Sequence, residues 1–197
     1  INYFFDFTEI CYENYNLNNN KNYHYLSLYL SLLEKLNIKI TSKNHYLPFN
    51  NPTKITNFDK GYCLIHIDKR WELFSKSVMI DLKEKIFLLS KDKNIVISSN
   101  IGSNHVFEYL KNELLNISNI EIIVGPSLHD VISLVYFSNS CISSHCGLIV
   151  HSAAAFKKKV IDIVSEDIFN ELDRWVPYNI NYKRLNINNF INTDFDI

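Results

Sequence analysis

The sequence predicts an α/β fold in which a doubly wound parallel sheet is covered by helices on both faces. Two observations favour this fold. Between residues 62 and 165, short apolar runs alternate with longer segments of helical periodicity. The short runs are apolar at successive positions, as expected for parallel strands with both faces buried. Right-handed crossovers between such strands build a doubly wound sheet.

Strands are predicted where a short apolar run is bounded by polar or turn-forming residues. The first run, "YCLIHI", contains His66, which we expect to be a core histidine with its hydrogen bonds satisfied. Trp71, just after it, is expected to pack in the core. The predicted strands cover residues 62–67, 94–99, 120–124, 141–143 and 159–164.

Helices are predicted where leucines and other apolar residues recur at three- and four-residue spacing. Ser103 is the expected N-cap of one helix, and Ser127 followed by Asp130 is the pattern of a capped helix start. Pro177 is the expected stop of the last helix. The predicted helices cover residues 24–38, 71–91, 103–116, 127–139, 147–156 and 166–175.

The composition gives no signature of several classes of function. The net charge of −1, from 20 basic and 21 acidic residues, gives no sign of nucleic-acid binding or of a polybasic membrane surface. The four cysteines form no Cys-x-x-Cys pair, so we expect reduced thiols of a cytoplasmic protein. The apolar stretch before Glu34 is too short and too amphipathic to span a bilayer. The sequence begins with Ile1, which leaves open whether it is a fragment.

Topology predicts where a ligand binds. A doubly wound sheet binds ligands beyond the carboxyl ends of its strands, at the point where the strand order reverses. With an order such as 3-2-1-4-5, the loops 68–72 and 144–147 become neighbours there. Lys69 and Arg70 bring two cations, and Gly147 opens a helix whose unpaired N–H groups face them. This combination favours a diphosphate site, although neither GxGxxG nor a Walker motif is present.

The stretch "SSHCGLIVHSAAAF" also allows other chemistry. His145, Cys146 and His151 could be metal ligands, or Cys146 could be a nucleophile at a helix N-terminus. The spacing matches neither His-Glu-x-x-His nor a Cys-x-x-Cys finger. His151 either contacts the ligand or is a buried, hydrogen-bonded histidine.

Two segments together resemble glycosyltransferase family 9, the heptosyltransferase family of lipopolysaccharide synthesis. "GYCLIHIDKRWELFSKSVMIDL" resembles the opening of that family's C-terminal domain. "VGPSLHDVISLVYFSNSCISSHCGLIVHSAAAFKKKVIDIV" resembles its later part, with a Ser/Thr-Leu pair, an Asp-Ser/Thr-Gly turn and a helix bearing His and alanines. The match spans roughly 62–165. The chain departs from the family where His145 or Ser144 replaces an acid, and where His151 follows Gly147 by four positions instead of three.

The resemblance implies a GT-B architecture, two Rossmann-like domains with a cleft between them. It implies that this chain carries the end of an N-terminal domain and a linker in 1–60, a nucleotide-sugar-binding domain in 61–176 and a C-terminal tail in 177–197. Phosphate contacts would come from Lys69 and from the backbone around Gly147. The expected nucleotide-sugar-binding residues are Lys69, Arg70, Gly125, Ser127, Ser144, His145, Cys146, Gly147 and His151.

The resemblance also implies an activity, transfer of a hexosyl or heptosyl group from a nucleotide-diphosphate sugar to a glycan or lipid-linked glycan of lipopolysaccharide type. The catalytic base would lie in the missing N-terminal half, so this chain alone would be incomplete. No metal or other cofactor is expected, and the protein would be cytoplasmic or peripheral at the inner face of the membrane. The alternatives are a non-catalytic GT-B-like binding module, a polysaccharide pyruvyl transferase and a sugar-nucleotide epimerase.

Overall fold

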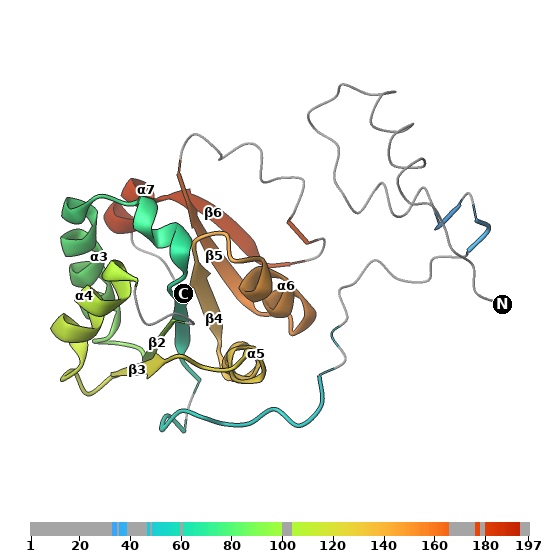
Figure 1. Ribbon diagram of the computed structural model, residues 1–197, viewed down its shortest axis with the longest axis horizontal. Helices are drawn as coiled ribbons and strands as arrows, with labels where there is room; N and C mark the ends of the chain where they lie inside the picture. Colours follow the sequence, from blue (N-terminus) through green and yellow to red (C-terminus); the bar gives the residue numbers. More distant parts are fainter. Residues whose placement is uncertain are drawn as a thin grey trace. The chain divides into compact units, whose positions relative to one another are not determined.

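The computed structural model describes the chain in two units (Figure 1). One unit contains residues 1–43 and 167–176, and the other contains 44–166 and 177–197. Most described residues belong to the second unit. The structure describes residues 33–34, 36–38, 47, 49–59, 61–99, 104–165, 176–177 and 180–193.

The second unit is built on a parallel sheet with the strand order β3-β2-β1-β4-β5-β6. Every neighbouring pair is parallel. The predicted doubly wound sheet is therefore confirmed, as is the order of its first five strands. The strands are β1 (Cys63–His66), β2 (Ile95–Ser99), β3 (Ile120–Val124), β4 (Ser140–Ser143), β5 (Lys159–Val164) and β6 (Tyr182–Asn186).

Helices cover both faces of this sheet (Figure 1). One face carries η1 (Lys69–Leu73), α3 (Lys76–Leu89), α4 (His105–Leu114) and α7 (Ile187–Asn192). The other face carries α5 (Leu128–Phe137) and α6 (Gly147–Ala155). In the described part of the chain, no helix has the length and apolarity needed to cross a membrane.

The single helix predicted over 71–91 is wrong, because the segment divides into η1 and α3. The Asp68 carboxylate accepts the Arg70 N–H at 2.9 Å, which starts a short 3-10 helix directly after β1. Ser75 is in an extended conformation and caps α3. Asn104, instead of the predicted Ser103, caps α4 by accepting the N–H groups of its first turn. Asp68 and its flanking residues are thereby held at the end of β1.

The sheet contains one strand that the sequence analysis did not predict. β6 and α7 lie in residues 177–197, and β6 pairs with β5 from Tyr182 to Asn186. Its sequence, "YKRLN", is polar because an edge strand buries little of its surface, and only Leu185 within it is buried. An apolar run was therefore absent where a strand forms.

Two other predicted helices fall mostly or entirely outside the described residues. The helix over 166–175 lies outside them, as does most of the helix over 24–38. Leu33 and Glu34 are helical. Asn37 has a positive φ of 56°, and the Ile38 N–H donates to the Leu33 carbonyl, which is a Schellman-type helix end.

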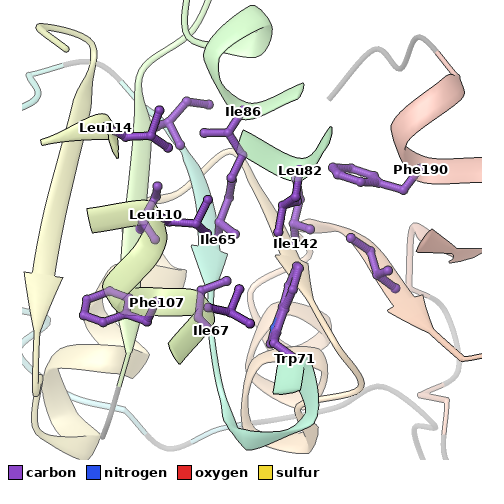
Figure 2. Close-up of a cluster of buried hydrophobic side chains, with 14 of the residues drawn as sticks. Ile65, Ile67, Trp71, Leu82, Ile86, Phe107, Leu110, Leu114, Ile142 and Phe190 are labelled. Atoms are coloured by element: carbon purple, nitrogen blue, oxygen red, sulfur yellow. The ribbon is translucent and has the colours of Figure 1, made fainter. Parts of the chain in front are cut away.

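The core on the α3 and α4 face is built from large side chains (Figure 2). Trp71 and Phe107 are fully buried there, and the Trp71 indole N–H donates to the His66 carbonyl at 2.9 Å. Trp71 is a core residue, as predicted. The same core includes Ile65, Ile67, Leu82, Ile86, Leu110, Leu114, Ile142 and Phe190.

The core on the α5 and α6 face uses smaller residues. Leu64 and Val96 of the sheet meet Val131 of α5 and Ile149 of α6. Ala153 is fully buried in the same cluster, so α6 approaches the sheet closely. The first turn of α6 is thereby held near the carboxyl end of β4.

We expect Ser127→Ala to lower the free energy of unfolding by about 1 kcal/mol, because it removes a complete capping box. The Ser127 Oγ accepts the Asp130 N–H at 3.1 Å, and Asp130 in turn accepts the Ser127 N–H. Urea unfolding of the full chain measures the change. Ser75→Ala is the matched control, since among the described residues the exposed Ser75 hydroxyl bonds only to the Ser77 hydroxyl and accepts no backbone N–H of α3. An equal loss in both variants would contradict the assignment.

Candidate functional site

The candidate site lies at the carboxyl ends of β1 and β4. β1 pairs with β2 on one side and with β4 on the other, so the strand order reverses between β1 and β4. We call this position the switch point. The charges of Asp68 and Arg70, both after β1, act on the pKa of the Cys146 thiol after β4. The two loops are thus neighbours, as the topology predicted.

The loop after β1 presents two cations of unequal availability. Arg70 and Lys69 are both exposed. Arg70 is tied to Asp68, with Nη1 2.6 Å from Oδ2 and a backbone N–H on the same carboxylate. Lys69 has no ion-pair partner in the part of the chain that the structure describes. Lys69 is therefore the cation at the switch point whose charge is not already balanced by a neighbouring acid.

The turn between β4 and α6 is held by Asp162 of β5, a fully buried residue that the sequence analysis missed. Its carboxylate accepts the backbone N–H of His145 and lies 3.0 Å from His145 Nδ1. It also accepts the hydroxyls of Ser143, at 3.3 Å, and Tyr182, at 2.6 Å. Four donors on one carboxylate match the capacity of an ionised, acceptor-only group. The signal in the sequence was one acid inside the apolar run "KVIDIV".

This network explains an unusual backbone conformation. His145 has a φ of 48°, in the left-handed region that non-glycine residues seldom adopt. The bond from its N–H to Asp162 fixes the turn in that conformation. Tyr182 supports Asp162 from β6, and burial together with the neighbouring carboxylate raises the pKa of Tyr182 above its usual value. Tyr182 therefore stays a hydroxyl donor near neutral pH.

The first turn of α6 leaves room for a ligand atom near the backbone. Gly147 is exposed, and a Cβ built there would meet nothing nearer than His151 Cδ2 at 3.9 Å, apart from its own helix and chain neighbours. Ser144 and Cys146 are buried on either side of His145. The open backbone at Gly147 is compatible with the predicted anion contact.

The side-chain alternatives at this turn find no support. Burial raises the pKa of the Cys146 thiol, which is the opposite of what an activated nucleophile needs. Among the described residues, no group of three or more His, Cys, Asp or Glu side chains could hold a metal ion. The described cysteines Cys63, Cys141 and Cys146 are free thiols.

The other predicted residues also follow the carboxyl ends of strands, but they are not all close to one another. His151 is exposed on α6 one turn beyond Gly147, so a buried histidine at this position was the wrong alternative. Gly125 and Ser127 follow β3, which is separated from β1 by β2. Gly125 has a φ of 61°, and a Cβ there would meet no atom within 4 Å. The Ser127 hydroxyl is occupied by the α5 capping box.

His66 differs from the prediction of a satisfied core histidine. It is fully buried at the end of β1, and its Nδ1 lies 3.0 Å from Ser98 Oγ. Its Nε2 has no hydrogen-bond partner among the described residues. Desolvation by burial lowers the pKa of His66 to about 4, so the buried ring is neutral near pH 7.

Comparison with known proteins shows which solved structures share the fold. No protein-family model and no curated protein matches the sequence. A glycosyl transferase family 9 protein from Veillonella parvula superposes with a TM-score of 0.57, at 14% identity over 85% of this chain and 50% of the other. The Methanocaldococcus jannaschii UDP-GlcNAc 2-epimerase gives 0.52 at 16% identity, covering 68% of this chain and 40% of the other. The E. coli heptosyltransferase WaaC gives 0.50 at 20% identity, covering 66% and 40%.

These similarities show a Rossmann-like, GT-B-like fold for the chain. The chain spans 40 to 50% of the length of these three proteins. At such identities the likeness concerns the fold alone. The epimerase was solved with UDP-GlcNAc and UDP, and WaaC with ADP.

We expect His66 to make the protein less stable as the pH falls from about 6.5 to about 4. In this window the unfolded chain binds a proton at His66 and the folded chain does not, so unfolding is favoured by up to about 3 kcal/mol at the low end. Urea unfolding at several pH values should show a flatter pH dependence for His66→Asn than for the parent. Ser75→Ala, at an exposed residue that does not titrate, is the control and should keep the parent slope. Equal slopes in all three proteins would refute the effect.

Proposed function

We propose that this chain is the donor-binding half of a GT-B glycosyltransferase that resembles family 9. It would bind a nucleotide-diphosphate sugar whose glycosyl group passes to a glycan or lipid-linked glycan. One observation carries the proposal: the strand order places Lys69 and the first turn of α6 together at the switch point. The ligands of the epimerase and of WaaC, UDP-GlcNAc, UDP and ADP, support a nucleotide-linked ligand here.

The proposed chemistry is stabilisation of the departing diphosphate. When the glycosyl bond breaks, negative charge develops on the phosphate oxygen that leaves. The Lys69 ammonium and the unpaired N–H groups of the α6 start would offset this charge. Because the Lys69 ammonium and the N–H groups of α6 could themselves offset this charge, we propose a donor site that needs no metal ion. The catalytic base would belong to a second domain, and peripheral association with a membrane would follow from a lipid-linked acceptor.

The base and ribose are proposed to lie near Val124–Ser127. Gly125 and Ser127 follow β3 at the same edge of the sheet, and the exposed Val124 offers an apolar surface beside them. The open space around Gly125 is compatible with a flat base near the backbone. The distance along the edge from β3 to β4 suits an extended ligand such as a nucleotide, because neighbouring strands lie about 5 Å apart.

Three other functions remain as alternatives. A sugar-nucleotide epimerase is supported by the fold likeness to the UDP-GlcNAc 2-epimerase, and it would use the same donor site. A polysaccharide pyruvyl transferase would share the architecture, and product analysis with a panel of donors separates these enzymes. A non-catalytic binding module is supported by His145 at a position where the family carries an acid.

We expect UDP, ADP or GDP to bind saturably, and Gly147→Ala to weaken the binding at least about tenfold. The added methyl group would occupy the space where a phosphate approaches the backbone, while meeting no protein atom nearer than 3.9 Å beyond its own helix and chain neighbours. Because alanine also favours helix formation, the variant should be at least as stable as the parent. Isothermal titration and urea unfolding measure the two effects. Equal nucleotide affinities of the parent and Gly147→Ala would show that the first turn of α6 does not contact the ligand.

We expect Lys69→Ala to weaken nucleotide diphosphate binding by about tenfold, since it removes the cation that no described acid balances. Lys91→Ala is the matched control. Lys91 lies at the amino ends of the strands, where it lines a hollow of about 420 Å³ with Gly61 and Asn94. Isothermal titration at low salt compares the three proteins. Unchanged affinity in Lys69→Ala would favour the binding-module alternative.

A further inference from the structure

We propose that His145 takes up a proton when a diphosphate binds at the switch point, with Asp162 and Tyr182 as positioning residues. The inference rests on the proposed function, because the diphosphate is the one carried by the nucleotide ligand. It assigns to His145 a role that neither the strand order nor the helix N-terminus implies.

Asp162 fixes the orientation of the His145 ring. The Asp162 carboxylate is acceptor-only, and it lies 3.0 Å from Nδ1, so Nδ1 carries a proton and donates it. The Tyr182 hydroxyl donates to the same carboxylate oxygen at 2.6 Å and fixes it in place. In the neutral ring, the lone pair therefore lies on Nε2. This is the atom at which His145 gains a proton.

The Nε2 atom of His145 is accessible to solvent. The His145 side chain is 18% exposed, whereas Asp162 is completely buried. Among the described residues, Nε2 has no hydrogen-bond partner, and it is not one of the solvent-inaccessible polar atoms. The backbone N–H of His145 also donates to Asp162, so both ends of the residue are held. The ring presents Nε2 from a fixed turn directly before α6.

Several charged groups surround the His145 ring. Asp162 faces it from β5, and Tyr182, which accepts an N–H from Arg184 at 3.3 Å, lies beyond from β6. On the β1 side, Asp68 and Arg70 form an ion pair and largely cancel. Lys69 and the N-terminal end of α6 add positive charge, which a bound diphosphate would offset. A diphosphate would add negative charge beside the ring, and a nearby negative charge favours the protonated imidazole. Binding and proton uptake are then linked, and each strengthens the other.

A second residue points to a ligand at the same place. His66 is completely buried, and its Nε2 has no partner among the described residues, although buried polar atoms are seldom left unpaired. Side chains alternate along a strand, so His66 lies on the same face as Leu64, which packs in one cluster with Cys146 at the start of α6. The unpaired Nε2 therefore lies on the face of the sheet that α5 and α6 cover.

The register extends this polar row across the sheet. The last shared pair of β1 and β4 is Ile65 with Ile142, so His66 and Ser143 are the next residues of the two strands. Ser143 in turn pairs with Asp162 on β5. A histidine, a serine and an aspartate thus occupy neighbouring strands below the turn that carries His145.

The test is isothermal titration of the full chain with UDP, ADP, GDP and inorganic pyrophosphate in buffers of different ionisation enthalpy. We expect uptake of up to one proton on binding near pH 7, and its loss in His145→Asn. Asparagine adopts a positive φ readily, so this variant keeps the turn and removes only the titrating ring. Within the pH range in which proton uptake accompanies binding, the advantage of the parent over His145→Asn should fall by up to about tenfold per pH unit as the pH rises.

Two controls separate the titration from simple structural damage. The ligand's own phosphate titrates in a similar range, and the difference between parent and His145→Asn removes that contribution. His151→Asn changes the other histidine near Gly147 and should retain the proton uptake. Tyr182→Phe removes one donor to Asp162 and should shift the pH profile of binding, whereas a purely structural role would lower stability and leave the profile in place.

The outcomes distinguish this inference from the proposed function. Nucleotide binding with the same proton uptake in the parent and in His145→Asn overturns the inference and leaves the proposed function standing. Pyrophosphate binding with His145-dependent uptake, but without binding of any nucleotide, supports the inference and contradicts the proposed function. Failure of all four ligands to bind overturns both.

Discussion

The buried carboxylate of Asp162 is the group on which the candidate site depends. It lies in the middle of β5 and accepts hydrogen bonds from Ser143, His145 and Tyr182, which belong to β4, the turn before α6, and β6. Without this acceptor, all of these donors would lose their partner, and the buried Ser143 hydroxyl alone would cost about 1–3 kcal/mol. One charged side chain inside the sheet therefore determines the conformation of a surface turn and the position at which α6 begins.

The strand order of the sheet brings together the two loops that form the candidate site. Because β4 returns beside β1 instead of continuing past β3, two loops that are distant in sequence meet at one edge. One loop offers an uncompensated lysine and an arginine held by Asp68. The other offers an open helix start and an imidazole held by Asp162. In the proposed function, these positive and hydrogen-bonding groups of the two loops would stabilise an anionic leaving group.

Much of the fold was predictable from local patterns, and the exceptions share a cause. The boundaries of β3 and β5 and the capping box of α5 agree with prediction, because a buried strand needs an apolar run and a helix start needs an acceptor for its first N–H groups. β6 was missed because an edge strand can be polar, and the break between η1 and α3 was missed because Asp68 caps a helix that hydrophobic periodicity does not register.

For the site, too, some features were predictable from the sequence and others depended on the tertiary structure. The sequence alone predicted the parallel sheet, because buried strands and crossover helices leave local patterns. With the common order 3-2-1-4-5 assumed, it also predicted the meeting of the two loops that carry Lys69, Arg70 and Gly147. Only the tertiary structure decided that Asp162 supports His145, that Asp68 holds Arg70, and that His66 keeps an unpaired nitrogen. Those contacts depend on distances of about 3 Å between side chains on different strands, which no pattern along a single chain encodes.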